Sequence, residues 1–198
     1  MSNINIIIMG APGSGKGSMC KKLVEEFDYK LVSAGDILRA EQATGSELGK
    51  KIGDIIDGGN LLPDSMIDKI IYNEIRKGLR IDQAFLVDGY PRSIKQALSL
   101  DQMINVPVVI WLSVPDEVTI ERNTRRGRMG SGRPDDSSDE IIRKRLDTFK
   151  EISLPVKKWY DDRIVEIDAT GTVDEVYKRI TDTLFNTVKE AKEASDIV

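Results

Sequence analysis

The 198-residue chain has no histidine and a single cysteine, and no part of it is a long run of apolar residues. The absence of histidine excludes a histidine general base, and one cysteine allows neither an internal disulfide nor a multi-cysteine zinc site. A net charge of −4 disfavours non-specific binding to nucleic acid. No apolar run approaches the roughly 18 residues of a membrane span, and the N-terminus lacks a signal-peptide pattern. We therefore expect a cytoplasmic protein that binds neither membrane nor nucleic acid.

The residues that are present predict one α/β domain spanning residues 1–198. The chain is 40% hydrophobic, and its β-branched apolar runs alternate with helical patterns throughout. That alternation is typical of a parallel sheet covered by helices on both faces. Strands are expected at 4–8, 30–32, 84–87, 106–114 and 164–167. Ligands of such sheets bind at the carboxyl ends of the strands, where the turns 10–16, 33–39, 88–92 and 168–172 would gather.

Several helix ends can also be predicted. Asp116 is a candidate N-cap. The patterns Ser137-x-x-Glu140 and Thr172-x-x-Glu175 fit capping boxes for two later helices. Pro155 is expected to kink or end the first of these two helices.

The segment from Gly10 to Lys16 has the Gly-x-x-x-x-Gly-Lys spacing of a phosphate-binding loop, between a predicted strand and a predicted helix. Its glycines allow a tight turn that points successive backbone N–H groups at one anion. Lys16 supplies a mobile charge for the outer phosphates, and the following helix offers its positive dipole end. A plain turn between strand and helix does not account for this lysine. The usual hydroxyl after the lysine is displaced by one position, with Gly17 followed by Ser18.

Seven arginines lie between residues 122 and 145, and Arg122 and Arg126 share one helix face through their i, i+4 spacing. Phosphoryl transfer needs positive charge around the equatorial oxygens of the transferred group, which arginine provides with a permanently charged fork. We assign Arg125, Arg128 and Arg143 to an ordinary solvated face, as most charge runs are. The other four are candidates for phosphate binding.

The chain resembles the adenylate kinase branch of the nucleoside monophosphate kinase family along nearly its whole length. The resemblance depends on separate motifs: Gly10 to Ser18, Ser33 to Arg39, Phe85 to Arg92 with Gln96, Gly132 to Asp136, and Arg-Lys-Arg at 143–145. It implies a P-loop three-layer sandwich with a helical monophosphate-binding lobe at about 33–62 and a short lid at about 127–136. It also implies a monomer that transfers the terminal phosphoryl group of Mg-ATP to AMP, giving two ADP, with Mg2+ as cofactor and no zinc.

The resemblance further implies a role for individual residues. ATP would be bound by Gly13, Ser14, Gly15, Lys16, Gly17, Ser18, Arg122 and Gly171. AMP would be bound by Ala34, Arg39, Asn60, Leu61, Leu62, Gly89, Tyr90, Pro91, Arg92, Gln96, Arg133 and Arg145. The catalytic residues would be Lys16, Arg92, Arg126, Arg133 and Arg145. Magnesium would be held by Ser18 and Asp88, through water.

Two alternatives stay open at this point. Ala34 stands where adenylate kinases usually have threonine, and alanine is more typical of the uridylate–cytidylate branch, whereas Gln96 is the residue expected for AMP. A UMP/CMP kinase is therefore the second hypothesis. The third is a nucleotide-binding regulatory protein that transfers no phosphate, and the retained Arg39, Arg92 and Gln96 speak against it.

Overall fold

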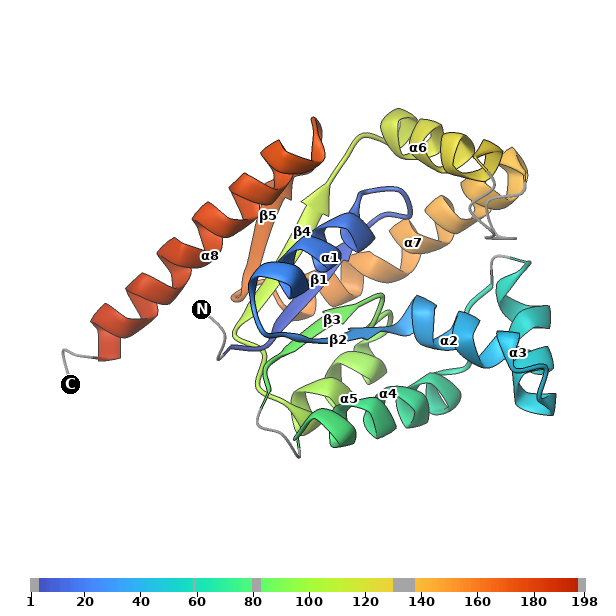
Figure 1. Ribbon diagram of the computed structural model, residues 1–198, viewed down its shortest axis with the longest axis horizontal. Coiled ribbons are helices and arrows are strands. Elements are labelled where there is room, and N and C mark those ends of the chain that lie inside the picture. Colours follow the sequence, from blue (N-terminus) through green and yellow to red (C-terminus); the bar gives the residue numbers. More distant parts are fainter. Residues whose placement is uncertain (1–3, 59, 80–82, 130–137, 196–198) are drawn as a thin grey trace.

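The computed structural model describes residues 4–58, 60–79, 83–129 and 138–195, and over these it has a five-stranded parallel sheet with helices on both faces (Figure 1). The strands, in the order β2-β3-β1-β4-β5 across the sheet, have the bounds β1 Ile6–Gly10, β2 Lys30–Ser33, β3 Phe85–Asp88, β4 Val108–Ser113 and β5 Ile164–Asp168. The helices are α1 Lys16–Glu26, α2 Ala34–Ala43, α3 Glu47–Ile56, α4 Asp64–Leu79, α5 Ile94–Met103, α6 Asp116–Arg128, α7 Asp139–Trp159 and α8 Val173–Ser195. The predicted α/β sandwich is therefore confirmed. None of the helices in these ranges is long and apolar enough to cross a membrane.

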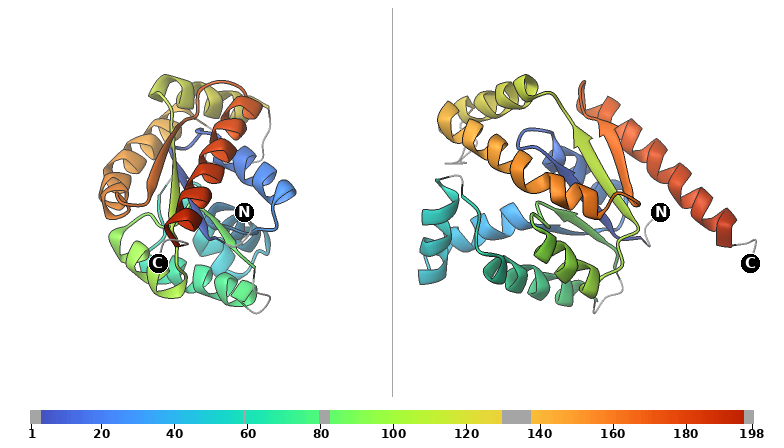
Figure 2. Two further views of the ribbon diagram at one scale, coloured as in Figure 1. Left: turned by 90° about the vertical axis from the view of Figure 1, so that its left-hand side faces the viewer. Right: turned by 180° about the vertical axis from the view of Figure 1, so that it is seen from behind.

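The central strand β1 is buried on both sides of the sheet, which is why it reads as an unbroken apolar run rather than an alternating one. Ile6 and Ile8 pack against Leu23 of α1 and Ile180 of α8. Ile7 belongs to the opposite core, with residues of α4, α5 and α7. The two cores on either side of the sheet give three layers, and the left-hand view of Figure 2 shows helices on both sides of the strands.

Helices α2 and α3 extend from the carboxyl end of β2, away from the main body of the sheet (Figure 1). Gly45, with φ of 67°, lies in the turn between them. Ser46 then caps α3 by accepting a hydrogen bond from the backbone N–H of Gly49 at 2.9 Å. The chain therefore leaves α2 after Ala43 and enters α3 at Glu47.

Two predicted helix boundaries were wrong, and Pro155, expected to kink or end its helix, does not end it. Asp116 is the first helical residue of α6 rather than its N-cap, and its carboxylate pairs with Lys150 of α7. The N-cap of α7 is Ser138, one residue after the predicted Ser137, which lies outside the described residues. Pro155 lies inside α7 and does not end it, because the buried side chains of Val156 and Tyr160 keep the last turn packed on the core.

The capping box at Thr172 and Glu175 is confirmed at the start of α8. The Thr172 backbone donates to the Glu175 carboxylate at 2.8 Å, and the Glu175 backbone donates to the Thr172 hydroxyl at 3.3 Å. The predicted lid can be followed only in part. Helix α6 continues through Arg128, so its first residues are helical, while residues 130–137, with Arg133, lie outside the described ranges.

Candidate functional site

The predicted phosphate-binding loop joins the end of β1 to the start of α1 and has the required glycine geometry. Gly13 and Gly15 have φ values of 89° and 99°, a region in which a side chain would be strained. The backbone N–H groups of Ser18 and Met19 donate to the carbonyl of Gly15 at 3.0 and 3.1 Å, which begins the helix. The loop and the helix N-terminus together form an anion-binding concavity.

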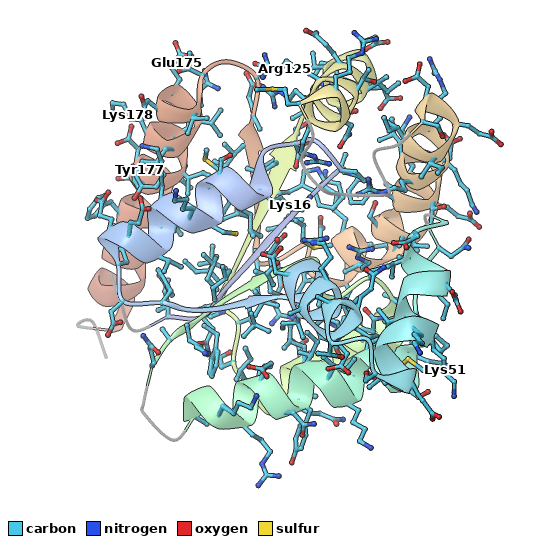
Figure 3. All side chains as sticks on the ribbon, turned by 45° about the vertical axis from the view of Figure 1, so that its right-hand side comes forward. Lys16, Lys51, Arg125, Glu175, Tyr177 and Lys178 are labelled. Atoms are coloured by element: carbon cyan, nitrogen blue, oxygen red, sulfur yellow. The ribbon has the colours of Figure 1, made fainter. Side chains whose placement is uncertain are left out.

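Lys16 is half-buried beneath this loop, where its ammonium group donates to the carbonyls of Gly10 at 2.8 Å and Ala11 at 3.1 Å. Figure 3 shows it in the middle of the molecule, whereas Lys51 and Lys178 lie at the outer surface. Burial lowers the pKa of Lys16 to about 8, with Asp88 acting in the opposite direction and the charge of Arg92 adding to the decrease. A bound anion would relieve this cost by pairing the buried charge.

Asp88 ends β3 beside the loop and is the candidate magnesium residue. The Ser33 hydroxyl donates to its Oδ2 at 3.2 Å. Its Oδ1 is buried and has no hydrogen-bond partner among the described residues, which leaves one carboxylate oxygen available to a water or a cation. Oxygen donors of this kind suit Mg2+, which usually keeps several waters and binds through one or two carboxylates together with substrate phosphates. The described residues contain no cluster of three or more His, Cys, Asp or Glu able to hold a metal ion on their own.

These groups open into one cleft of about 430 Å³ at the carboxyl ends of β1, β2 and β3. Most of the residues predicted for the site line it: Gly13, Gly15, Lys16, Gly17, Ser18, Arg39, Asn60, Leu61, Asp88, Gly89, Tyr90, Pro91, Arg92, Arg126 and Arg145. Three of the four predicted turns therefore meet there. The turn at 168–172 does not line this cleft.

Besides Lys16, the cleft is lined by four arginines, each from a different element or loop. Arg39 of α2 pairs with Asp36, and Arg92, which follows β3, donates through Nε to the carbonyl of Gly89 at 2.9 Å. Arg126 of α6 and Arg145 of α7 close the other side. The three arginines assigned to a solvated face, Arg125, Arg128 and Arg143, are exposed, as predicted. The concentration of positive charge in one cleft favours a ligand with several negative charges.

Four predicted site residues are buried and absent from the cleft lining. Ser14 is 1% exposed, Ala34 is 3% exposed and Leu62 is 8% exposed. Gln96, 5% exposed, uses its amide on neighbouring protein groups, accepting from the Arg92 backbone at 2.6 Å and donating to Asp64 at 2.6 Å. A base contact by Gln96 would require exchange of one of these hydrogen bonds.

Arg122 and Gly171, both expected at the ATP base, lie next to each other beside the end of β5. The guanidinium of Arg122 donates to the carbonyl of Ala169 at 3.1 Å and to that of Gly171 at 3.4 Å. Arg179 of α8 holds the same loop by donating to the carbonyls of Asp168 and Thr170, each at 2.8 Å. The two residues are thus brought together, although outside the residues that line the main cleft.

Sequence reasoning missed one wall of the cleft. Thr148, Phe149, Ile152 and Ser153 of α7 line it together with Arg145. Their spacing of three, four, seven and eight residues from Arg145 places them on the same helix face, so the helical period could have identified them. Asn123, buried between Arg126 and the phosphate loop, was also missed, and no spacing signal distinguishes it.

Comparison with known proteins agrees with this geometry. A family model described as Adenylate kinase matches residues 8–165. Adenylate kinase isoenzyme 1 of Gallus gallus is 38% identical over 179 residues, covering 88% of this chain and 91% of the relative. Adenylate kinase of Phocaeicola vulgatus is 39% identical over 184 residues, covering 89% and 96%. Uridylate kinase of Saccharomyces cerevisiae is 35% identical over 184 residues, covering 90% and 89%. The chain belongs to the adenylate kinase family.

Proposed function

We propose that the chain is an ATP-dependent nucleoside monophosphate phosphotransferase that reversibly transfers the terminal phosphoryl group of Mg-ATP to AMP, giving two ADP. The observation that carries the proposal is the composition of one cleft. It is lined on one side by the phosphate loop with Lys16, and on another by Arg39 and Arg92, which come from separate segments. Two sets of phosphate-binding groups facing one cavity suit a reaction between two phosphorylated substrates.

The proposed division of labour follows from charge and position. Gly13 to Ser18 would bind the ATP phosphates, while Arg39 and Arg92 would bind the monophosphate. Lys16, Arg126 and Arg145 would stabilise the charge that spreads over the transferred group, and this reaction requires little covalent assistance from the protein. Arg133 and the lid at about 127–136 belong to the proposal through the sequence resemblance alone.

Magnesium fits the residues available to it. The unpartnered Oδ1 of Asp88 and the nearby hydroxyl of Ser18 would hold a hydrated ion through water. When bound, the ion would neutralise part of the negative charge of the ATP phosphates. The chain's own part is to keep Asp88 oriented, which the hydrogen bond from Ser33 supports.

The acceptor base is the finer part of the proposal. Gln96 carries an amide that could donate to adenine N1 and accept from the N6 amino group. The chain's similarity to a protein named uridylate kinase, and the presence of Ala34, make UMP/CMP kinase the alternative. A regulatory protein without phosphotransfer is disfavoured, because it would have no use for Arg39 and Arg92 in the same cleft.

We also propose that the protein acts as a cytoplasmic monomer, without nucleic-acid or membrane partners. Its acidic net charge of −4 supports the absence of a nucleic-acid partner. The proposed architecture is one domain over 1–198, with the monophosphate lobe at about 33–62 and the lid at about 127–136.

The test is ADP formation from Mg-ATP with AMP, UMP, CMP or GMP as acceptor, with acceptor-free reactions measuring hydrolysis. We expect AMP to have the highest kcat/KM, with detectable activity on UMP or CMP. A higher kcat/KM for UMP or CMP would replace the proposed acceptor by a pyrimidine nucleotide. Absence of transfer to all four acceptors, with tight ATP binding, would support the regulatory alternative.

A further inference from the structure

Asn123 of α6 is 2% exposed, and every polar atom of its side chain is used. Its amide nitrogen donates to the carbonyl of Pro12 at 2.9 Å and to that of Thr119 at 2.8 Å. Its amide oxygen accepts from the guanidinium of Arg126 at 2.6 Å. Because carbonyls only accept and guanidinium groups only donate, these partners fix which end of the amide is nitrogen and which is oxygen.

The amide lies where the phosphate loop touches α6. A Cβ added to Gly13 would lie 2.5 Å from the Asn123 amide nitrogen and 2.7 Å from the Thr119 carbonyl oxygen. The loop backbone is therefore packed directly on this helix. The same amide contacts both the loop and the cleft. Its nitrogen donates to the carbonyl of Pro12 in the loop, and its oxygen accepts from Arg126, which lines the cleft.

An apolar side chain could fill this position without the cost of burying an amide. The presence of a buried amide is explained if it holds the Pro12 carbonyl and the Arg126 guanidinium at a fixed position relative to each other. Arg126 lines the cleft, and its long side chain has many rotamers that would not face a phosphate. A charge-assisted hydrogen bond to a fixed acceptor restricts this freedom.

We propose that Asn123 is a positioning residue for phosphoryl transfer, one that joins the backbone of the phosphate loop to the guanidinium of Arg126. Asn123 would thereby fix the distance between the phosphate loop, which is proposed to bind ATP, and Arg126, which is proposed to contact the transferred group. The inference rests on the proposed phosphotransferase function. It adds a residue that makes no contact with the reacting groups and acts through Arg126.

The experiment is a double-mutant cycle with Asn123→Leu, Arg126→Ala and the combined variant, assayed for kcat and for both KM values. Leucine has the same branched arrangement of side-chain heavy atoms as asparagine and lacks the amide, although its methyl groups are bulkier. Loss of a hydrogen bond to a charged group predicts a fall in kcat of roughly ten- to a hundredfold for Asn123→Leu. In the Arg126→Ala background the same substitution should change kcat by less than about threefold, because the arginine to be positioned is gone.

Asn73→Leu is the matched control, since Asn73 is exposed on α4 and the chemical change is the same. Asn123→Asp is the second variant, used with a thermal-unfolding measurement in case the leucine variant fails to fold. It keeps an oxygen for Arg126 and loses the donor to Pro12, so its kcat should exceed that of Asn123→Leu while its KM for ATP rises.

A purely structural role would give equal losses of kcat in the wild-type and Arg126→Ala backgrounds, and that result overturns the inference. An unchanged kcat in Asn123→Leu overturns it as well. Both outcomes are read against an active wild-type enzyme. If wild type itself transfers no phosphate to any acceptor, the proposed function fails first.

Discussion

At the scale of single residues, Lys16 shows two opposing requirements in one side chain. Its charge is the one we propose for binding nucleotide phosphates, yet burial lowers its pKa to about 8 and so disfavours that charge in the free protein. The two carbonyl contacts at Gly10 and Ala11 compensate part of the cost. A nucleotide phosphate would compensate it better, because its full negative charge replaces weak carbonyl dipoles.

We predict that Lys16→Met leaves the fold intact and removes most of the activity. Methionine keeps the length of the side chain and loses its charge, so the lost hydrogen bonds and the relieved burial cost oppose each other in stability. Loss of one preorganised electrostatic contact should lower kcat by roughly two to three decades. ADP formation measures the loss of activity, and thermal unfolding measures the change in stability.

Lys21→Met is the control, because Lys21 is on the same helix with its side chain 77% exposed. A folded Lys16→Met protein with more than about a tenth of wild-type turnover would contradict the assigned role.

The residue scale is also where sequence reasoning was least complete. The spacing of the phosphate loop predicted Lys16 and its glycines, since those residue types are dictated by local backbone geometry. Gln96 was predicted to bind AMP, which stays a prediction, but its partners in the free protein, the Arg92 backbone and Asp64, 32 positions away in the chain, were not predicted. Such a choice among partners depends on tertiary placement, which no local pattern encodes. Asn123 was missed for the same reason, because its partner Pro12 is 111 positions away.

At the scale of elements, strands and helices were predicted well and their ends less well. Apolar runs identified every strand of the described sheet, although β1 begins at Ile6 and not at residue 4. The wrong ends have a common cause, because several neighbouring polar residues could act as caps and packing decides among them. Pro155 is a separate case, because a proline in a helix offers no cap and was expected to kink or end α7. The proline removes one helical hydrogen bond, but the burial of the adjacent Val156 and of Tyr160 offsets the loss.

The pairing of α2 with α3 allows a prediction at this scale. Gly49 of α3 is buried so closely against α2 that a Cβ there would overlap the carbonyl oxygen of Glu41. Alanine in a free helix would be more stable than glycine by about 1 kcal/mol. Here we expect Gly49→Ala to destabilise instead, because inserting an extra methyl group into a well-packed contact typically costs about 1–3 kcal/mol. The KM for the monophosphate should rise several-fold, since Arg39 and Gln42 of α2 line the cleft, while the Kd for Mg-ATP changes little.

Gly53→Ala provides the graded comparison for this prediction. A Cβ at Gly53 would lie 2.8 Å from the amide nitrogen of Gln42, the far end of a flexible side chain that can move. Its effects on the melting temperature and on the KM for the monophosphate should therefore be smaller than those of Gly49→Ala. Equal effects in the two variants, or a Gly49→Ala protein as stable as wild type, would show that the two helices are not held at this distance.

At the scale of the whole molecule, the cleft is assembled from segments spread over most of the chain. The phosphate loop follows β1, Arg92 follows β3, and Arg145 belongs to α7, near the other end of the sequence. Only the parallel order of the strands brings their carboxyl ends to one edge (Figures 1 and 2). That edge could be predicted from the alternation of strands and helices. The placement of the 168–172 turn outside the cleft could not be predicted, because it depends on β5 being the outermost strand, next to β4.

This arrangement predicts that one ligand bridging both halves of the cleft stabilises the protein more than either nucleotide alone. Two adenosines joined by a chain of five phosphates could contact the phosphate loop at one end and Arg39 and Arg92 at the other. Once the first end is bound, binding of the second end costs little further translational and rotational entropy. The free energy of its contacts therefore adds almost fully to the binding free energy. Stabilisation grows by about 1.4 kcal/mol for each tenfold gain in affinity at saturating ligand. Thermal unfolding at equal concentrations of the bridging compound, ATP and AMP measures this stabilisation directly.

Diadenosine triphosphate is the control for length, because its shorter chain should bind through one end and shift the melting temperature no more than ATP does. A five-phosphate compound that also shifted it no more than ATP would mean that the two sets of cationic residues do not serve one bound pair of substrates.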